Sequence, residues 1–125
     1  MIELVSVVRP RAIMIENVRG LLDPKFAAYR TSVEEHLAQI GYSLQWKLLQ
    51  ASDFGVPQLR PRVIAVGFRN DIAVSFEYPS PSPHRAPTVG ETLVDLMAER
   101  GWKGAQAWAA RANRIAPTLV GGSKK

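Results

Sequence analysis

The 125-residue sequence contains no cysteine and only two histidines, and these scarcities limit the chemistry that the chain can perform alone. Without cysteine the chain has no disulfide, no thiolate ligand for a metal and no cysteine nucleophile of its own. His36 and His84 stand far apart in the sequence, away from other groups that bind metals. We therefore predict no zinc or iron site and interpret both histidines as ordinary surface or helix residues.

Long apolar runs are also missing. No stretch approaches the roughly 20 apolar residues that a membrane-spanning helix requires. The N-terminus lacks the basic region and apolar core of a secretory signal. We expect a cytoplasmic protein, of prokaryotic type, that makes no contact with a membrane.

Acidic residues are absent from residues 100–125, roughly the last quarter of the chain, although the whole sequence contains 16 basic and 11 acidic residues. This imbalance gives a net charge of +5 and favours a partner that carries phosphate groups. We interpret the last quarter as the electrostatic footprint of that partner. Its basic residues are Arg100, Lys103, Arg111, Arg114, Lys124 and Lys125.

The apolar pattern predicts an α/β protein, and nothing in its length requires more than one domain. Pro10 ends a first helix, while Asp23 and Pro24 supply an N-cap and a first helical position for the second helix, which Gly41 ends. The short apolar run that begins at Ala12 is typical of a strand covered on both faces. The predicted elements are a helix over 1–8, a strand over 12–15, a helix over 24–40, and strands over 42–48 and 63–68.

Four prolines divide the chain after its last strand. They fall within residues 79–87, which cannot form regular structure and are predicted to be a linker. Thr88 and Glu91 form a possible capping box for a helix that Gly101 ends, and a short helix is expected over 105–112. The predicted regions are 1–78, the linker 79–87 and the helical segment 88–125.

The segment from Ser52 to Arg62 is the most informative part of the sequence. Its prolines favour an extended course, which places Gln58, Arg60 and Arg62 on one face. An amide and two guanidinium groups in a row suit phosphate oxygens or an electron-rich ring carbonyl. An arginine pair bridged to surface carboxylates remains the alternative for Arg-Pro-Arg taken alone.

Glu16 is expected at the end of the first strand, where open α/β sheets bind their ligands. Burial there would favour a protonated carboxyl group able to donate a hydrogen bond to a ring nitrogen. The alternative is that Glu16 or Asn17 only caps the following turn.

Three segments of the sequence resemble the DNA (cytosine-5)-methyltransferases in their order, spacing and strand contexts. They are Glu-Asn-Val at 16–18, Gln-x-Arg-x-Arg at 58–62 and the apolar strand end at 66–71. The resemblance extends from about Leu4 to the linker and more loosely to 116–123, which is similar to the start of a target-recognition region. It implies a partial Rossmann-like methyltransferase sheet. The last three strands of that sheet would be present with their flanking helices, the strand over 63–68 lying antiparallel between the other two.

The resemblance also implies roles for individual residues. The family transfers a methyl group from S-adenosylmethionine to carbon 5 of a flipped cytosine, after a cysteine thiolate has added to carbon 6. Glu16 would hold the N3 edge and the exocyclic amine of the cytosine, and Arg62 would contact its carbonyl. Arg60 would steady the site, while Gln58 and Asn17 would support it.

The resemblance leaves parts of the enzyme unaccounted for. Neither the Pro-Cys loop nor the glycine-containing cofactor motif of the family, both expected upstream, is in this sequence, so no residue is assigned to S-adenosylmethionine. We expect a central fragment that binds duplex DNA, in part through Lys124 and Lys125, and is inactive without the remaining part of the enzyme. Its free edge at the Ile13 strand predicts a homodimer. The alternative is a non-catalytic DNA-binding or regulatory module derived from the family.

Overall fold

The computed structural model describes residues 1–119, which form two compact units. Unit 1 consists of Met1–Leu49 and Pro61–Pro79. Within the described residues, unit 2 consists of Gln50–Arg60 and residues 80–119. The segment between the second and third strands therefore belongs to unit 2, and the predicted limits at residues 78 and 88 stay predictions.

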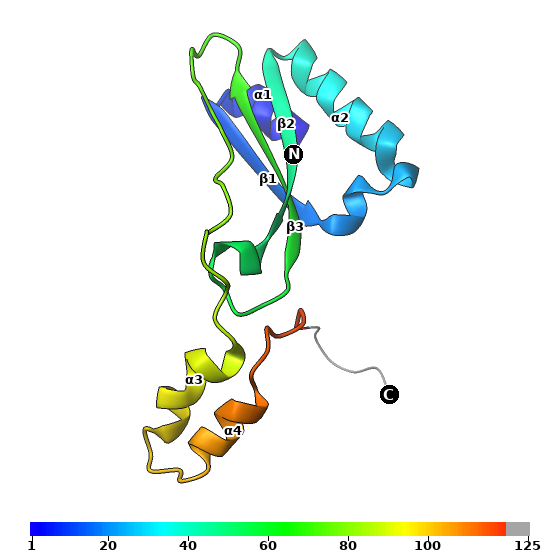
Figure 1. Ribbon diagram of the computed structural model, residues 1–125. Helices are drawn as coiled ribbons and strands as arrows, with labels where there is room; N and C mark the ends of the chain where they lie inside the picture. The colour runs from blue at the N-terminus through cyan, green and yellow to red at the C-terminus, as the bar shows by residue number, and fades with distance from the viewer. Residues whose placement is uncertain (120–125) are drawn as a thin grey trace. The chain divides into compact units, whose positions relative to one another are not determined.

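Unit 1 is built on a three-stranded sheet in which β3 lies between β1 and β2 (Figure 1). β1 and β3 are antiparallel, with Ala12 opposite Phe68 and Val18 opposite Arg62. The predicted position of the middle strand, antiparallel to the strand of Ile13, is confirmed. The strands are β1 (Ala12–Val18), β2 (Tyr42–Gln50) and β3 (Pro61–Arg69).

Two helices of unit 1 build the core on one face of the sheet. They are α1 (Ile2–Val8) and α2 (Ala27–Gln39). Leu37 of α2 is completely buried, and Tyr42 at the start of β2 is 1% exposed and donates a hydrogen bond to the Pro10 carbonyl at 2.6 Å. Val5 of α1 and Ile13 of β1 complete this cluster. Helix and sheet are therefore joined by apolar burial with one satisfied hydroxyl.

The predicted start of the second helix is wrong by three residues. Pro24–Phe26 forms a short 3-10 helix, and Asp23 makes no capping hydrogen bond through its side chain. The guanidinium group of Arg30 instead donates to the carbonyls of Leu21 and Asp23, at 2.6 and 3.2 Å. The helix ends as predicted before Gly41, which adopts a φ of 82° that favours glycine.

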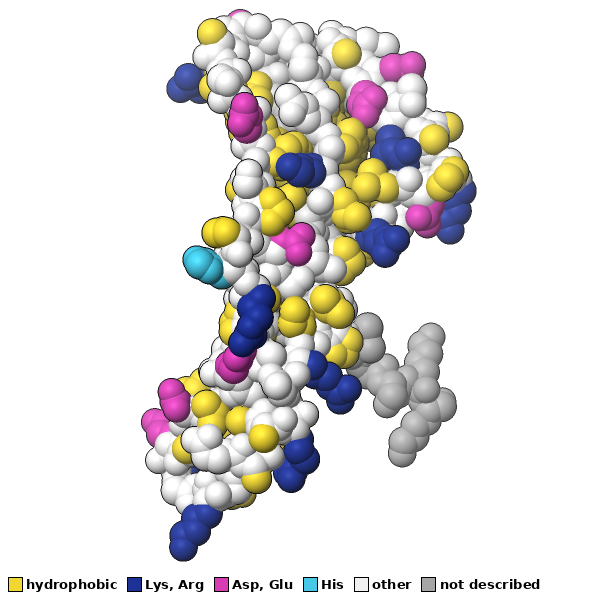
Figure 2. All heavy atoms as spheres, viewed as in Figure 1, with side chains coloured by type: hydrophobic (Ala, Val, Ile, Leu, Met, Phe, Trp, Pro, Cys, Tyr) yellow, Lys and Arg dark blue, Asp and Glu magenta, His cyan; other side chains and the backbone are white. Residues whose placement is uncertain are grey.

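The expected coverage of β1 on both faces is also wrong. Ile13 is buried against the helices, but Met14 on the opposite face is 75% exposed. The strand continues beyond the predicted end, so Glu16 lies inside β1, opposite Ile64 of β3. In residues 1–119 the other edge of β1 has no partner strand. Hydrophobic side chains consequently show on the surface of unit 1 (Figure 2).

The chain after β3 folds back onto the sheet. Phe76 packs against Phe68 and Tyr78, with ring centroids 5.5 and 5.0 Å apart. The Tyr78 hydroxyl donates to the carbonyls of Gln45 and Ile64, and burial raises the pKa of Tyr78. This irregular segment therefore ties β2 to β3 through backbone carbonyls.

Unit 2 contains a helix pair, α3 (Val89–Ala98) and α4 (Ala105–Arg111). The predicted capping box is confirmed, because the Thr88 hydroxyl accepts from the Glu91 amide at 3.2 Å and the Glu91 carboxylate accepts from the Thr88 amide at 2.7 Å. The helices cross so closely that a Cβ on Gly90 would lie 2.2 Å from the Ala109 carbonyl oxygen. None of the helices described in residues 1–119 is long and apolar enough to cross a membrane.

Candidate active site

The structure brings together two of the predicted site residues, Glu16 and Arg62. Their side chains form an ion pair with 2.5 Å between the Arg62 Nε and the Glu16 Oε1. The register explains the contact, because Val18 lies opposite Arg62 and Glu16 is two residues earlier on the same face. The two motifs thus meet through the antiparallel pairing of β1 with β3.

This ion pair is open on the carboxylate side. The side chain of Glu16 is 54% exposed and that of Arg62 is 22% exposed, so the expected burial of Glu16 is wrong for this chain. Arg62 also donates through Nη1 to the Pro61 carbonyl at 2.8 Å, which fixes the guanidinium plane. On one planar ligand, the half-exposed carboxylate can accept from an amine while the anchored guanidinium donates to a neighbouring carbonyl.

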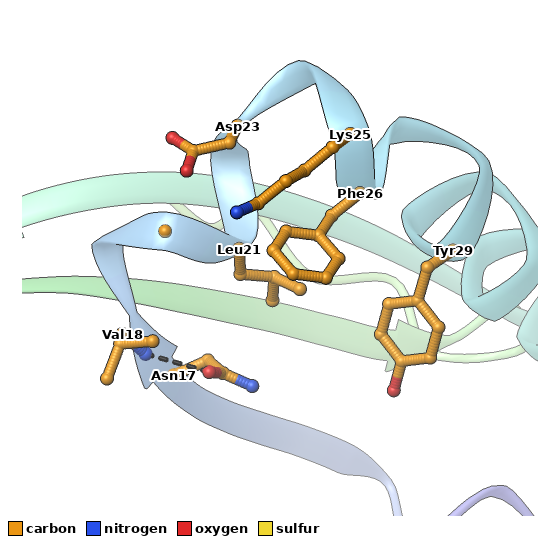
Figure 3. Close-up of a pocket in the computed structure, with 8 residues that line it drawn as sticks. Asn17, Val18, Leu21, Asp23, Lys25, Phe26 and Tyr29 are labelled. Carbon is orange, nitrogen blue, oxygen red and sulfur yellow. Dashed lines mark hydrogen bonds between the residues drawn. The ribbon is translucent and has the colours of Figure 1, made fainter.

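Asn17 lies on the other face of β1, because neighbouring residues of a strand alternate. Its side-chain oxygen accepts a hydrogen bond from the Val18 amide at 2.8 Å. A hollow of ≈ 360 Å³ opens beside it (Figure 3), lined also by Leu21, Phe26 and Tyr29. This mainly apolar hollow includes neither Glu16 nor Arg62, and it is separate from the ion pair.

Gln58 and Arg60 lie in unit 2, in a segment fixed by its backbone. Ala51–Phe54 is a 3-10 helix, Gly55 has a φ of 83°, and the Gln58 amide bonds to the Val56 carbonyl at 2.7 Å across Pro57. The chain is therefore folded before Gln58. The common face predicted for Gln58, Arg60 and Arg62 stays a prediction, because Arg62 belongs to unit 1.

Sequence reasoning missed the residues that hold this segment in place. Gln58 forms a parallel bridge with Ala116, and the Leu59 amide bonds to the Ala116 carbonyl at 2.7 Å. The Thr118 hydroxyl donates to the Leu59 carbonyl. Thr118 and Leu59 are 59 positions apart in the sequence, so no local pattern could have revealed their connection.

Other predicted groups are not located at this site. Lys124 and Lys125 lie outside the described residues. In residues 1–119 no cluster of three histidine, aspartate or glutamate side chains could hold a metal ion.

A second hollow of unit 1, of ≈ 250 Å³ and bordered by Met1, Leu4 and Met14, has an apolar lining. It does not fit the ribose and amino-acid groups of S-adenosylmethionine, so no residue is assigned to that cofactor.

The chain is similar to bacterial DNA-modifying enzymes along nearly its whole length. It is 60% identical over 124 residues to the type II methyltransferase M.NaeI of Lentzea aerocolonigenes, covering 99% of this chain and 30% of that protein. It is 55% identical over 111 residues to the type II methyltransferase M.NgoMIV of Neisseria gonorrhoeae, covering 89% of this chain and 36% of that protein. The chain thus spans about a third of the length of these relatives.

Solved structures agree with this similarity. A candidate DNA modification methyltransferase encoded within an E. coli prophage matches 74% of this chain and 27% of its own, with a TM-score of 0.62 and 26% identity. A mutant of Spodoptera frugiperda DNMT2 matches 70% of this chain and 28% of its own at a TM-score of 0.56, and its 22% identity supports the fold alone. The family model for C-5 cytosine-specific DNA methylases matches residues 1–124, and the chain belongs to that family.

Proposed function

We propose that this chain is the central segment of a DNA cytosine-5 methyltransferase and supplies one wall of the pocket for a flipped cytosine. The observation that carries the proposal is the ion pair between Glu16 and Arg62, in which one residue from each family motif reaches the other across two paired strands. The family supplies the reaction, which is methyl transfer to carbon 5 of the base.

The chemistry of cytosine fits the pair. Its exocyclic amine donates hydrogen bonds, and its ring nitrogen N3 and carbonyl oxygen are acceptors next to it. Glu16 would accept from the amine through one carboxyl oxygen and, with a proton on the other oxygen, donate to N3, while Arg62 would donate to the carbonyl. Attack at carbon 6 pushes negative charge onto this same edge of the ring, so the hydrogen bonds donated to N3 and to the carbonyl would strengthen in the transition state.

The supporting residues would position this wall. Arg60 would steady the site from its backbone-tied segment, in which its carbonyl accepts from the Ala51 amide at 3.2 Å. Gln58 would support that segment through its bridge with Ala116. Asn17, which is hydrogen-bonded to the Val18 amide, would hold the turn after β1.

The proposed reaction requires chemistry from outside this sequence. S-adenosylmethionine would donate the methyl group and a cysteine of another segment would supply the thiolate, since this chain contains no cysteine. We therefore expect the chain alone to be inactive, and its partners to be duplex DNA and the remaining part of the enzyme. This reaction would take place in the cytoplasm of a prokaryote.

A complementation assay tests the proposal. The chain is mixed with the remaining parts of the enzyme, of which the upstream part supplies the cysteine loop and the cofactor motif, and methyl transfer from labelled S-adenosylmethionine to duplex DNA is measured. Incorporation is expected only when all parts are present. No incorporation by a complex that is stable on size exclusion would overturn the enzymatic proposal.

A non-catalytic DNA-binding or regulatory module is the second candidate, favoured by the excess of basic residues after residue 100. The two candidates differ in their genomic setting. A neighbouring reading frame with a Pro-Cys loop and a cofactor motif would favour a split enzyme, whereas an intact second methyltransferase nearby would favour the binding module.

We also propose that the free edge of β1 pairs with a second copy when the rest of the enzyme is absent. Unpaired backbone groups of an edge strand are a template for another strand. Met14 in β1 and Leu4 in α1 are 75% and 66% exposed and would give such an interface an apolar surface. Light scattering at increasing concentration should detect a dimer, and a strictly monomeric protein would contradict this proposal.

A further inference from the structure

Unit 2 contains a concave surface at which positive charge and apolar side chains meet. The hollow has a volume of ≈ 370 Å³. Trp108 of α4 lies in its wall, with Arg111 and Arg114 at its border. Its remaining lining residues are small or apolar: Val89, Ala112, Ala116 and Pro117. We call this surface the Trp108 hollow.

We infer that the Trp108 hollow binds the sugar-phosphate backbone of the DNA duplex. This inference rests on the proposed function, which identifies DNA as the partner. The phosphate oxygens would lie on Arg111 and Arg114, and the apolar face of the deoxyribose would pack against the ring of Trp108. Such contacts position the duplex and carry no base specificity.

Both guanidinium groups are available for this role. Arg111 and Arg114 are exposed, whereas Trp108 is half-buried in the wall. The ion pairs found within residues 1–119 join Glu16 to Arg62, Arg69 to Asp71 and Arg85 to Glu91, and they involve neither arginine of the hollow. Arg111 and Arg114 therefore retain their charge and their donors for a phosphate.

Acidic and basic side chains lie on different sides of the helix pair. Figure 2 shows acidic side chains over α3 and basic side chains on the side of α4. Asp95 and Glu99 lie in or directly after α3, while residues 100–119 contain no acidic residue. A polyanion is therefore attracted to the α4 side and repelled by the α3 side.

The hollow is connected by backbone hydrogen bonds to the segment that carries Arg60. Ala116 lines the hollow and forms the bridge with Gln58. The Ala116 amide also bonds to the Pro57 carbonyl at 3.0 Å, and the Arg114 carbonyl accepts from the Val89 amide at 3.0 Å. A DNA strand held by Arg111 and Arg114 would thus be positioned by the same unit as Arg60.

Binding of the full chain to a fluorescent duplex, measured by anisotropy over a range of salt concentrations, tests the inference. Arg111→Ala and Arg114→Ala should each weaken binding, and each should do so by the same factor for duplexes of different sequence. Each should also reduce the slope of log K against log salt by about 0.9, the value for one lost phosphate contact. Arg11→Ala is the matched control, because it removes one exposed guanidinium group from unit 1, outside the hollow and outside the basic region 100–125.

Two further comparisons are needed. One distinguishes the phosphates of DNA from free phosphate, and the other distinguishes failure of this inference from failure of the proposed function. Inorganic phosphate should displace the duplex no better than sodium chloride of equal ionic strength, and specific competition would point to a free phosphate ligand instead. Slopes for Arg111→Ala and Arg114→Ala that equal the slope for Arg11→Ala would overturn the inference. If complementation gave no methyl transfer while these slopes still fell, the proposed function alone would be wrong.

Discussion

The two units of this chain are held together in different ways. Unit 1 buries large side chains, since Tyr42, Leu37 and Val63 are the largest residues that are fully buried. In unit 2 the buried residues are small, among them Ala86, Thr88, Gly90 and Ala105. Unit 1 is therefore stabilised by the burial of apolar area, and unit 2 by close backbone contacts, a capping box and hydrogen bonds between distant segments.

This difference also applies to the charged groups. In unit 1 the carboxylate of Glu16 and the guanidinium of Arg62 are paired on a sheet, where backbone pairing fixes their positions. In unit 2 Arg111 and Arg114 are exposed at the border of a hollow. A paired, positioned arrangement suits recognition of one base, whereas exposed arginines suit a backbone of repeated phosphates. We expect substitutions to separate these two kinds of contribution.

The largest effect is expected for Glu16→Gln in the reconstituted enzyme. Methyl transfer should fall by roughly 10²-fold to 10³-fold, because a contact that strengthens in the transition state is lost. Duplex affinity should change little. The pair is partly exposed, so the free energy of unfolding should change by less than about 1 kcal/mol.

The control for Glu16→Gln is Asp71→Asn, which removes a carboxylate paired with Arg69 just beyond the other end of β3. Single-turnover rates of both variants should be compared at saturating DNA. An unchanged rate for Glu16→Gln, or an equal loss for Asp71→Asn, would remove Glu16 from the mechanism.

The sequence predicted the parts of both units that depend on local pattern. The order of the strands and helices of unit 1, the stop at Gly41 and, in unit 2, the capping box at Thr88 all follow from periodicity and from residues with special conformations. The start of α2 does not follow from local pattern, because the Arg30 side chain donates to carbonyls seven and nine positions earlier. That contact exists only in the folded chain, where it favours a 3-10 turn over the predicted helix start.

The candidate site was predictable in composition but not in geometry. The motifs named Glu16 and Arg62, whereas their contact depends on the register of two strands that are distant in sequence. The bridge between Gln58 and Ala116 and the Trp108 hollow depend equally on long-range pairing. Composition indicated only that the last quarter is basic.

Gly90→Ala should have the next largest effect and should destabilise unit 2 without destabilising unit 1. Alanine normally stabilises a helix interior by up to about 1 kcal/mol relative to glycine. Here the new Cβ would lie 2.2 Å from the backbone carbonyl oxygen of Ala109, which cannot move without separating α3 from α4. Destabilisation by about 1–3 kcal/mol or more is expected, since overpacking against backbone outweighs helix propensity.

Amide NMR spectra can localise the damage from Gly90→Ala. Resonances of α3 and α4 should shift or broaden, while those of β1 and β3 should persist. Gly20→Ala is the matched control in unit 1, because its Cβ would meet its nearest neighbour, Asp23, at an ordinary 3.7 Å. Equal changes in both units after Gly90→Ala would show that they unfold together and would contradict the comparison.

Met14→Lys should have a smaller effect, confined to association through β1. A lysine on an exposed edge strand discourages pairing with another strand, and Met14 is 75% exposed, so the fold itself should be little affected. The dimer fraction measured by light scattering should fall. Val74→Lys, at a residue of unit 1 that is 50% exposed and outside the strands, should leave it unchanged. Equal effects of both substitutions would locate the interface elsewhere.

The smallest expected effect is a titration in unit 2. Hydrogen bonds from Arg85 and from the Thr88 amide lower the pKa of Glu91 from 4.5 to about 2. Because the folded-state pKa is lowered, the stabilisation is complete above pH 4.5 and disappears as the pH falls through about 2. The carboxyl carbon of Glu91, followed by NMR, should titrate near the lower value. Arg85→Ala should move that midpoint up more than Thr88→Ala, since the Arg85 contact is the larger cause and the Thr88 amide survives the second substitution. A midpoint near 4.5 in a protein whose α3 is still folded would show that the cap does not hold this carboxylate, and would leave close helix packing as the main source of order in unit 2.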